Sequence, residues 1–336
     1  MPRVLLIGPG HDDFLVDGLF HGLRTLLGPD AVDVPRIDHL YAGHPPERLR
    51  RLHGMGFTLG GLLDDDRDVD RDRAPYRAAQ GEFDLVVFAD IWRCFGAYVQ
   101  WMPPLAKANV PIAVLDTGDR IEPYPYSGLW WRVRHWWLLP RAHQRSLFFK
   151  REMNPWTAWF RTFLLVPGPL ASRLFLRDVK PISFSIPAER IVSRPPAKSK
   201  DWPAHVVDPE VAARVGAQTS YAFDDAAAYH ADLRASRFGV TTKKAGWDGL
   251  RHYEIAAAGA VPCFRALDRK PVRCAPFGLD RSNCLIYRDA DDLLAQVDAL
   301  DDAGYAQLQA GALAWARAST TEARARQFLA ACGISP

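Results

Sequence analysis

The chain has 336 residues, of which 48% are hydrophobic, and a formal net charge of +3. That length suffices for two ordinary domains, and that apolar content allows a buried core, which argues against global disorder. So small a charge gives no reason to expect a nucleic-acid partner. The five cysteines form no CxxC pair, which fits a reducing cytoplasm and argues against a disulfide framework or a zinc site.

The N-terminal apolar run covers only residues 4–7, and it is too short for the hydrophobic region of a signal peptide. Elsewhere no stretch approaches the ~20 apolar residues that span a bilayer. We therefore expect a cytoplasmic protein without a membrane span.

Strand-like and helix-like patterns alternate through the first half of the chain. Such alternation predicts an α/β fold with a parallel, doubly wound sheet. The predicted helices cover residues 14–27 and the segment before Pro111. The predicted strands cover residues 4–7, 31–34, 83–89, 111–115, 147–149 and 182–186.

An aromatic and basic insertion occupies residues 130–165. Three uses remain open for it: a buried core between domains, a platform that stacks on sugar rings, and peripheral docking of residues 130–137 at an anionic membrane surface. Its tryptophans are Trp130, Trp131, Trp136, Trp137, Trp156 and Trp159.

Residues 193–200 are rich in proline and lysine, as interdomain linkers often are. We therefore expect an N-terminal domain over residues 1–190 and a C-terminal domain over residues 191–336. In the second domain, the patterns predict strands at 238–242, 260–264 and 283–287. They predict helices at 224–234, 251–259, 289–300, 303–317 and 320–332.

The segment KKAGWDGLRHYE combines two lysines, a glycine turn and a helix start. A helix N-terminus favours anions, lysine adds a mobile charge, and arginine can grip phosphate oxygens with two hydrogen bonds. A solvated surface loop is the alternative, but the combination favours anion binding. The residues concerned are Lys243, Lys244, Gly246 and Arg251.

Glu254 follows Arg251 by three residues, with His252 between them. That spacing places Arg251 and Glu254 on one helix face. The two could form a simple ion pair, or Glu254 could accept hydrogen bonds from sugar hydroxyls beside a bound anion. Both alternatives stay open at this stage.

The run from Glu254 through Gly259 to Val261 and Pro262 resembles the donor-site signature of GT-B-fold glycosyltransferases. The pattern SRFG...R..E..A.G.VP over residues 236–262 is also similar to exostosin-like and spore-maturation-type glycosyltransferase domains. This resemblance implies two Rossmann-like domains facing a cleft and a nucleotide-diphosphate sugar as donor. Many retaining members carry a second glutamate where this chain has Trp247, so the stereochemistry of transfer stays open.

The resemblance also implies roles for the donor-site residues. Glu254 would bind the donor ribose, Arg251 with Lys243 or Lys244 would bind the diphosphate, and His252 and Gly246 would complete the site. Positive side chains and a helix end would stabilise the leaving group, a role that a metal fills elsewhere. We therefore expect no metal and no cofactor beyond the donor substrate.

Candidate catalytic bases follow two predicted strands of the first domain. His11 and Asp12 come after the first strand, where open α/β sheets place ligands, although Asp12 or Asp13 could instead cap the next helix. Asp119 follows the strand at 111–115, where the aspartates could also stabilise a turn. Asp116, Lys150 and Arg151 form the predicted acceptor-binding set.

Aspartates at 64–66, 68, 70 and 72 suggest a metal site, but arginines interleave with them, which favours a self-compensating solvated loop. Together these patterns predict a metal-independent glycosyltransferase that uses a nucleotide-sugar and a glycan, lipid-linked or other hydroxyl acceptor. The alternative is a non-catalytic glycan- or membrane-associated module with a degenerate GT-B fold.

Overall fold

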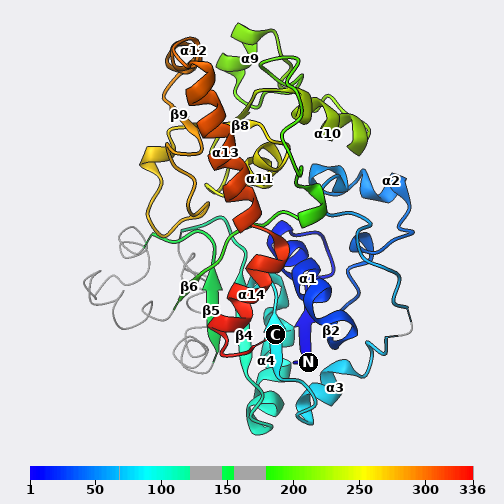
Figure 1. Cartoon of the computed structure of the whole chain (residues 1–336). Helices are drawn as coiled ribbons and strands as arrows, with labels where there is room; N and C mark the ends of the chain where they lie inside the picture. Colours follow the sequence, from blue (N-terminus) through cyan, green and yellow to red (C-terminus); the bar gives the residue numbers. More distant parts are fainter. Residues whose placement is uncertain (68, 122–145, 155–178, 336) are drawn as a thin grey trace, which may run out of the picture.

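The computed structural model describes residues 1–67, 69–121, 146–154 and 179–335, which form two α/β domains, one above the other (Figure 1). All the tryptophans of the aromatic insertion lie outside the described residues, as does Asp68, so its three possible uses stay predictions; residues 146–154 of the insertion are described. Each domain contains a parallel sheet, as the alternating pattern predicts.

The N-terminal sheet has six strands in the order β2-β1-β3-β4-β5-β6, and every neighbouring pair is parallel. The strands are β1 (Val4–Ile7), β2 (Ala31–Val34), β3 (Leu85–Phe88), β4 (Ile112–Asp116), β5 (Leu147–Lys150) and β6 (Lys180–Pro181). The helices are α1 (Phe14–Leu27), α2 (Pro46–Leu49), α3 (Ala74–Ala79) and α4 (Ile91–Lys107).

Both faces of this sheet are buried, because successive strand residues point to opposite sides. Val4 and Leu6 pack with α1, whereas Leu5 and Ile7 pack with α3 and α4. Continuous apolar strands of this kind are the signal that predicts a doubly wound sheet.

The C-terminal domain is built on β7 (Phe238–Thr241), β8 (Val261–Arg265) and β9 (Leu285–Tyr287), which are parallel and in that order. Its helices are α9 (Pro209–Val215), α10 (Ala226–Ala235), α11 (Leu250–Ala257), α12 (Ala290–Asp298) and α13 (Asp302–Ala318).

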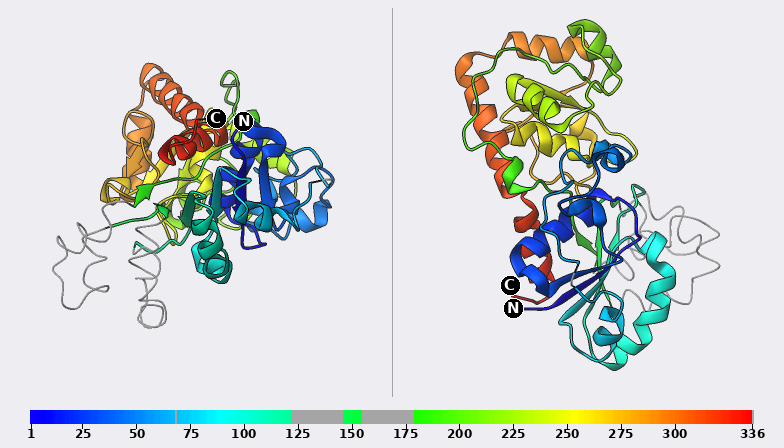
Figure 2. Two further views of the ribbon diagram at one scale, coloured as in Figure 1. Left: turned by 90° about the horizontal axis from the view of Figure 1, so that it is seen from below. Right: turned by 90° about the vertical axis from the view of Figure 1, so that its right-hand side faces the viewer.

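The last helix, α14 (Thr321–Ala331), returns to the first domain and packs along α1 (Figures 1 and 2). Nδ1 of His21 lies 2.9 Å from the Thr321 hydroxyl oxygen, and Phe328 and Leu329 join the core around α1. The chain thus ties its two domains together at its C-terminal end.

The prediction of a strand at 182–186 is wrong. The backbone of Ile186 instead pairs with Ser319 and Thr321, at 3.0 Å in both hydrogen bonds. This segment therefore joins the start of α14, and only the short strand β6 extends the sheet.

The aspartate-rich loop is largely exposed, as predicted, but Asp66 joins an ion-pair network that is partly buried. The Asp66 carboxylate is nearly buried and contacts the guanidinium groups of Arg24, Arg36 and Arg71. Arg71 also binds the buried Asp33 carboxylate at the end of β2. The arginines compensate the aspartates as predicted, but they do so partly inside the fold.

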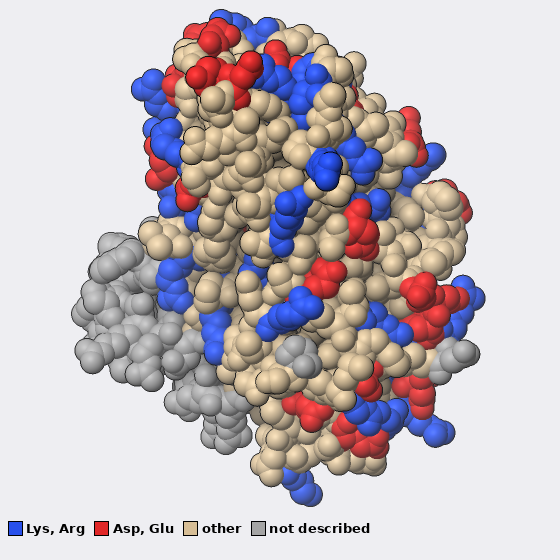
Figure 3. Space-filling model, in the orientation of Figure 1, with Lys and Arg blue, Asp and Glu red and all other residues tan. Residues whose placement is uncertain are grey.

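Among the described helices, none combines the length and the apolar character required to cross a membrane. Acidic and basic side chains are interspersed over the face shown in Figure 3, in keeping with the small net charge.

The contact between α1 and α14 depends on a glycine. A Cβ at Gly22 would lie 2.0 Å from the Thr321 carbonyl oxygen, whereas a Cβ at Gly96, in the exposed face of α4, would meet nothing within 4 Å. We expect Gly22→Ala to lower the free energy of unfolding by about 1–3 kcal/mol, because the helices must separate. Gly96→Ala raises the helix propensity as much as Gly22→Ala does, but it meets no neighbour. It should therefore be neutral or stabilise the protein by up to about 1 kcal/mol. Urea unfolding of both variants checks this, and equal stabilities would contradict the packing.

Candidate functional site

A cleft of about 570 Å³ lies between the two domains, within the ~300–1,000 Å³ typical of small-molecule sites. Acidic and basic side chains of both domains line it, including Arg93 from the N-terminal domain and Asp248 from the C-terminal domain. The N-terminal domain supplies Asp12, Asp13, His53, Thr117, Asp119 and Arg151. The C-terminal domain supplies His205, Tyr221, Tyr229, Lys244, Gly246, Arg251, His252 and Glu254.

The C-terminal side of the cleft is an anion-binding helix start. Helix α11 has Gly249 as its N-cap, and among the described residues no side chain caps its first amides. The helices α1, α9, α10, α12, α13 and α14 all carry an Asp or Thr cap. Uncapped amides at a helix start carry partial positive charge and favour an anionic ligand.

Arg251 adds a guanidinium that no described carboxylate neutralises. Its Nη2 lies 3.0 Å from Nδ1 of His205. Burial, with the positive charge of Arg251, lowers the pKa of His205 to about 4, so this histidine is neutral at pH 7. Arg251 is therefore bound to a neutral partner and not to an anion, so its guanidinium can meet an anionic ligand in the cleft.

The two adjacent lysines differ in position. Lys244 lines the cleft, whereas Lys243 is not part of its lining. The ammonium of Lys243 lies 3.3 Å from the carbonyl oxygen of Lys244 and 5.8 Å from the ring centroid of Trp247. Of the two, only Lys244 is placed to meet a ligand in the cleft.

Glu254 accepts hydrogen bonds from two hydroxyl groups. The Tyr229 hydroxyl donates to Oε2 at 2.5 Å, and the Thr58 hydroxyl donates to Oε1. Burial and the adjacent Glu254 carboxylate raise the pKa of Tyr229 well above its usual value, so Tyr229 remains a donor. Glu254 and Arg251 both belong to the described part of the chain, and they form no ion pair with each other. The simple ion pair, one of the two alternatives for their spacing, is therefore not what the structure shows.

His252 and Gly246 shape the loop before α11. The buried His252 ring donates from Nε2 to the Trp247 carbonyl at 2.9 Å, so its Nδ1 accepts from the Thr241 hydroxyl at 2.7 Å. Burial lowers the pKa of His252 to about 4, which keeps the ring neutral. At Gly246 a Cβ would lie 2.6 Å from Oε1 of Glu152, so only glycine fits there.

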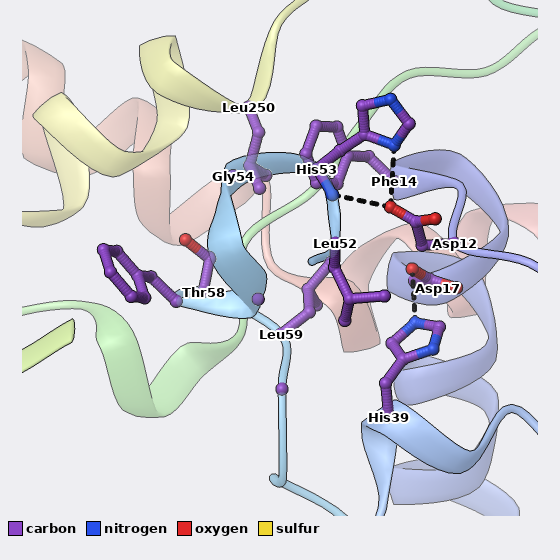
Figure 4. A pocket seen from close by; sticks show the side chains of 13 residues that line it. Asp12, Phe14, Asp17, His39, Leu52, His53, Gly54, Thr58, Leu59 and Leu250 are labelled. Carbon is purple, nitrogen blue, oxygen red and sulfur yellow. Dashed lines mark hydrogen bonds and ion pairs between the residues drawn. The ribbon is translucent and has the colours of Figure 1, made fainter. Parts of the chain in front are cut away.

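The N-terminal side of the cleft contains a carboxylate–histidine pair. Asp12 accepts from the backbone N and from Nδ1 of His53, both at 2.7 Å (Figure 4). Burial opposes ionisation of Asp12, but these hydrogen bonds outweigh it and lower its pKa. The His53 side chain is 81% exposed and lines the cleft. Sequence reasoning missed His53, because residues 42–80 are weakly periodic and offer no strand end to mark it.

His11 and Asp13 occupy different positions from Asp12. His11 is not among the cleft-lining residues; its Nδ1 lies 3.0 Å from the Asp12 carbonyl oxygen and its Nε2 lies 4.0 Å from Asp90. Asp13 caps α1 by accepting from the amides of Leu15 and Val16. Of the two capping candidates, Asp13 is therefore the cap, and Asp12 faces the cleft.

The predicted acceptor residues separate into two groups. Asp116 and Lys150 are fully buried and pair with each other at 3.1 Å, and neither is among the residues lining the cleft. Arg151 is also buried but lines the cleft, where it forms an ion pair with the half-exposed Asp119. The structure thus brings Asp119 and Arg151 to the cleft and uses Asp116 and Lys150 within the fold.

Asp13 should make the stability of the protein depend on pH. Burial, and then the neighbouring Asp17 carboxylate, raise the pKa of Asp13 to about 6. The folded protein thus binds this proton more tightly than the unfolded chain, whose aspartates titrate near pH ~3.9. Ionising Asp13 therefore costs stability as the pH rises from about 4 to about 6.

Between about pH 4 and pH 6, ionisation of Asp13 should lower the free energy of unfolding of wild type by on the order of 1–3 kcal/mol. We expect Asp13→Asn, which keeps a capping oxygen but cannot ionise, not to show this decrease. Urea unfolding at several pH values measures it. Asp225→Asn, at the exposed start of α10, controls for replacing a capping carboxylate. Parallel pH curves for wild type and Asp13→Asn would contradict the assignment.

No protein-family model matches this chain, and no curated protein matches it. Solved structures do resemble it. HepE from Anabaena in complex with UDP superposes with a TM-score of 0.56 at 11% identity, covering 99% of this chain and 100% of that one. A glycosyltransferase from Rickettsia africae gives 0.53 at 9% identity and covers 98% of each chain.

Sucrose-phosphate synthase from Thermosynechococcus elongatus gives a TM-score of 0.50 at 11% identity, covering 98% of this chain and 97% of that one. These neighbours cover both domains, and with the two parallel sheets they show that the chain has the GT-B fold.

Proposed function

We propose that this protein is a glycosyltransferase that moves a sugar from a nucleotide-diphosphate sugar to a hydroxyl acceptor. The observation that carries the proposal is the start of α11, where amides without a described side-chain cap and Arg251, which pairs with no described carboxylate, face an interdomain cleft. Similar folds support the donor class, since HepE has been solved with UDP and with UDP-glucose.

In this proposal the C-terminal domain holds the donor. Arg251, Lys244 and the first amides of α11 bind the diphosphate, and Glu254 accepts hydrogen bonds from the ribose. As the bond to the sugar breaks, negative charge grows on the departing diphosphate. Fixed positive groups aimed at that charge lower the barrier, so the proposed transfer is metal-independent.

The N-terminal domain would activate the acceptor. His53 donates Nδ1–H to Asp12, which leaves Nε2 able to accept a proton from a hydroxyl group. We propose His53 as the base and Asp12 as the residue that orients it. Asp119 is a weaker candidate because Arg151 already binds it, and His11 does not line the cleft. A glycan or lipid-linked acceptor, and the exostosin-like subtype, stay predictions.

The neighbouring lysines provide a matched test of donor binding. We expect Arg251→Ala to weaken the binding of nucleoside diphosphates about tenfold or more, because it removes a charge-assisted contact. Lys244→Ala should also weaken binding, whereas Lys243→Ala should bind like wild type. Calorimetric titration with UDP, GDP and ADP measures this. If Arg251→Ala and Lys244→Ala bind every diphosphate as wild type does, the donor site is wrongly placed.

The proposed base has a kinetic test. We expect His53→Ala to lower kcat about 10²–10⁴-fold without changing donor affinity, and Asp12→Asn to alter the pH profile through the orientation of His53. Release of nucleoside diphosphate from a panel of sugar nucleotides, with water as acceptor, provides the readout. Retained activity in His53→Ala with loss in Asp119→Asn would assign the base to Asp119. Binding without any release would favour a non-catalytic module.

A further inference from the structure

One segment of the N-terminal domain contacts residues of the donor half of the cleft. Residues 52–61, here called the bridging loop, run between the start of α1 and the start of α11, near Leu250 (Figure 4). On its own side the loop is held by the two hydrogen bonds from His53 to Asp12 and by one from the Gly61 amide to the His39 carbonyl, at 2.9 Å.

The middle of the bridging loop is attached to the C-terminal domain. The buried Phe57 ring packs on Tyr221 and Tyr229, with ring centroids 6.0 and 5.8 Å apart. The Phe57 carbonyl accepts from Nε2 of His230 in α10 at 3.1 Å. The Thr58 carbonyl accepts from Nε of Arg190, the last residue of the N-terminal domain, at 3.0 Å. These contacts orient the Thr58 side chain.

The bridging loop contains a tight turn with unusual backbone angles. Gly54, Met55 and Gly56 have φ values of 61°, 55° and 65°, in the left-handed region that favours glycine. A Cβ at Gly60 would lie 2.6 Å from the Gly56 carbonyl oxygen. The turn is therefore tight, and it delivers Thr58 to one defined position.

Thr58 is 2% exposed, and its hydroxyl donates to Oε1 of Glu254 while Tyr229 donates to Oε2. One carboxylate thus holds two hydroxyl groups, one from each domain. Two neighbouring hydroxyls on a carboxylate are also what the diol of a ribose would present. Tyr229 is fully buried in its own domain, whereas Thr58 belongs to a loop outside any sheet.

We infer that the Thr58 hydroxyl and the ribose of a nucleotide compete for the Glu254 carboxylate, so that donor binding releases the bridging loop from the C-terminal domain. This inference rests on the proposed function, because it assumes a nucleotide in the cleft. Such coupling is reciprocal. If a bound nucleotide weakens the attachment of the loop by some factor, the attached loop lowers the affinity for the nucleotide by the same factor.

Removing the hydroxyl tests the competition. We expect Thr58→Val, which keeps the shape of the side chain, to bind UDP or GDP about tenfold more tightly than wild type, since a hydrogen bond to a charged group is lost only from the competing state. Thr58→Ser retains the hydroxyl and should bind like wild type. A 2′,3′-dideoxy nucleoside diphosphate, which lacks the diol, should show no gain.

The gain must also depend on Glu254. In a Glu254→Gln background, Thr58→Val should add little, because the two residues act as one coupled pair. In wild type, the nucleotide should increase deuterium uptake by the amides of residues 53–60, which tests loop release without any substitution.

The outcomes separate the two proposals. Equal affinities of wild type and Thr58→Val, or a gain that persists with Glu254→Gln or with the dideoxy analogue, would overturn the competition while leaving the nucleotide site intact. Unchanged deuterium uptake on nucleotide binding would also overturn it. If neither protein binds any diphosphate, the proposed function fails, and the inference fails with it.

Discussion

The geometry of the cleft depends on a buried group of charges where the two domains meet. Arg151 donates from Nη1 to the Asp248 carbonyl at 3.0 Å, and Glu152 accepts the Asp248 amide at 2.8 Å. The Asp248 carboxylate in turn accepts from the Phe184 amide and the Tyr253 hydroxyl. Buried charges are stable only when paired and hydrogen bonded, so this group positions the loop before α11 relative to β5.

The N-terminal domain thus positions that loop. As a result, the anion-binding side of the cleft and the side that carries the proposed base are held in a fixed relation by buried charges. Arg251 and Lys244 face a side lined by Asp12, Asp13 and Asp119. The acids nearest the junction are neutralised locally, as in the pair of Asp119 with Arg151. Positive charge therefore stays concentrated at the start of α11, where a departing diphosphate would need it.

The sequence predicts the sheets well and the contacts between segments poorly. Strands such as β1 and β3 are apolar on both faces, so local pattern alone identifies them and their parallel arrangement. Residues 182–186 look like such a strand, yet Ile186 pairs with the start of α14, a contact that no local pattern encodes. The same reason hides His53, which lines the cleft, and Thr58, which contacts Glu254, because both lie in a weakly periodic segment. It also hides the ion pair between Asp116 and Lys150, because these two residues are more than thirty positions apart in the sequence. The donor segment was visible because its residues are contiguous on one loop and one helix.

Two further connections between the domains differ in kind. On one side α14 packs on α1 through an apolar core and a glycine that admits no side chain. On the other side the bridging loop is attached by hydrogen bonds, one of them to Glu254, and by Phe57, which joins a buried apolar cluster with Tyr229 and Ile255. Close-packed apolar surfaces resist separation, whereas hydrogen bonds can be exchanged for those of a ligand at little net cost. In this arrangement the residue that would hold the donor, Glu254, is also the residue that holds the loop, which links occupancy of the cleft to the contact between the domains.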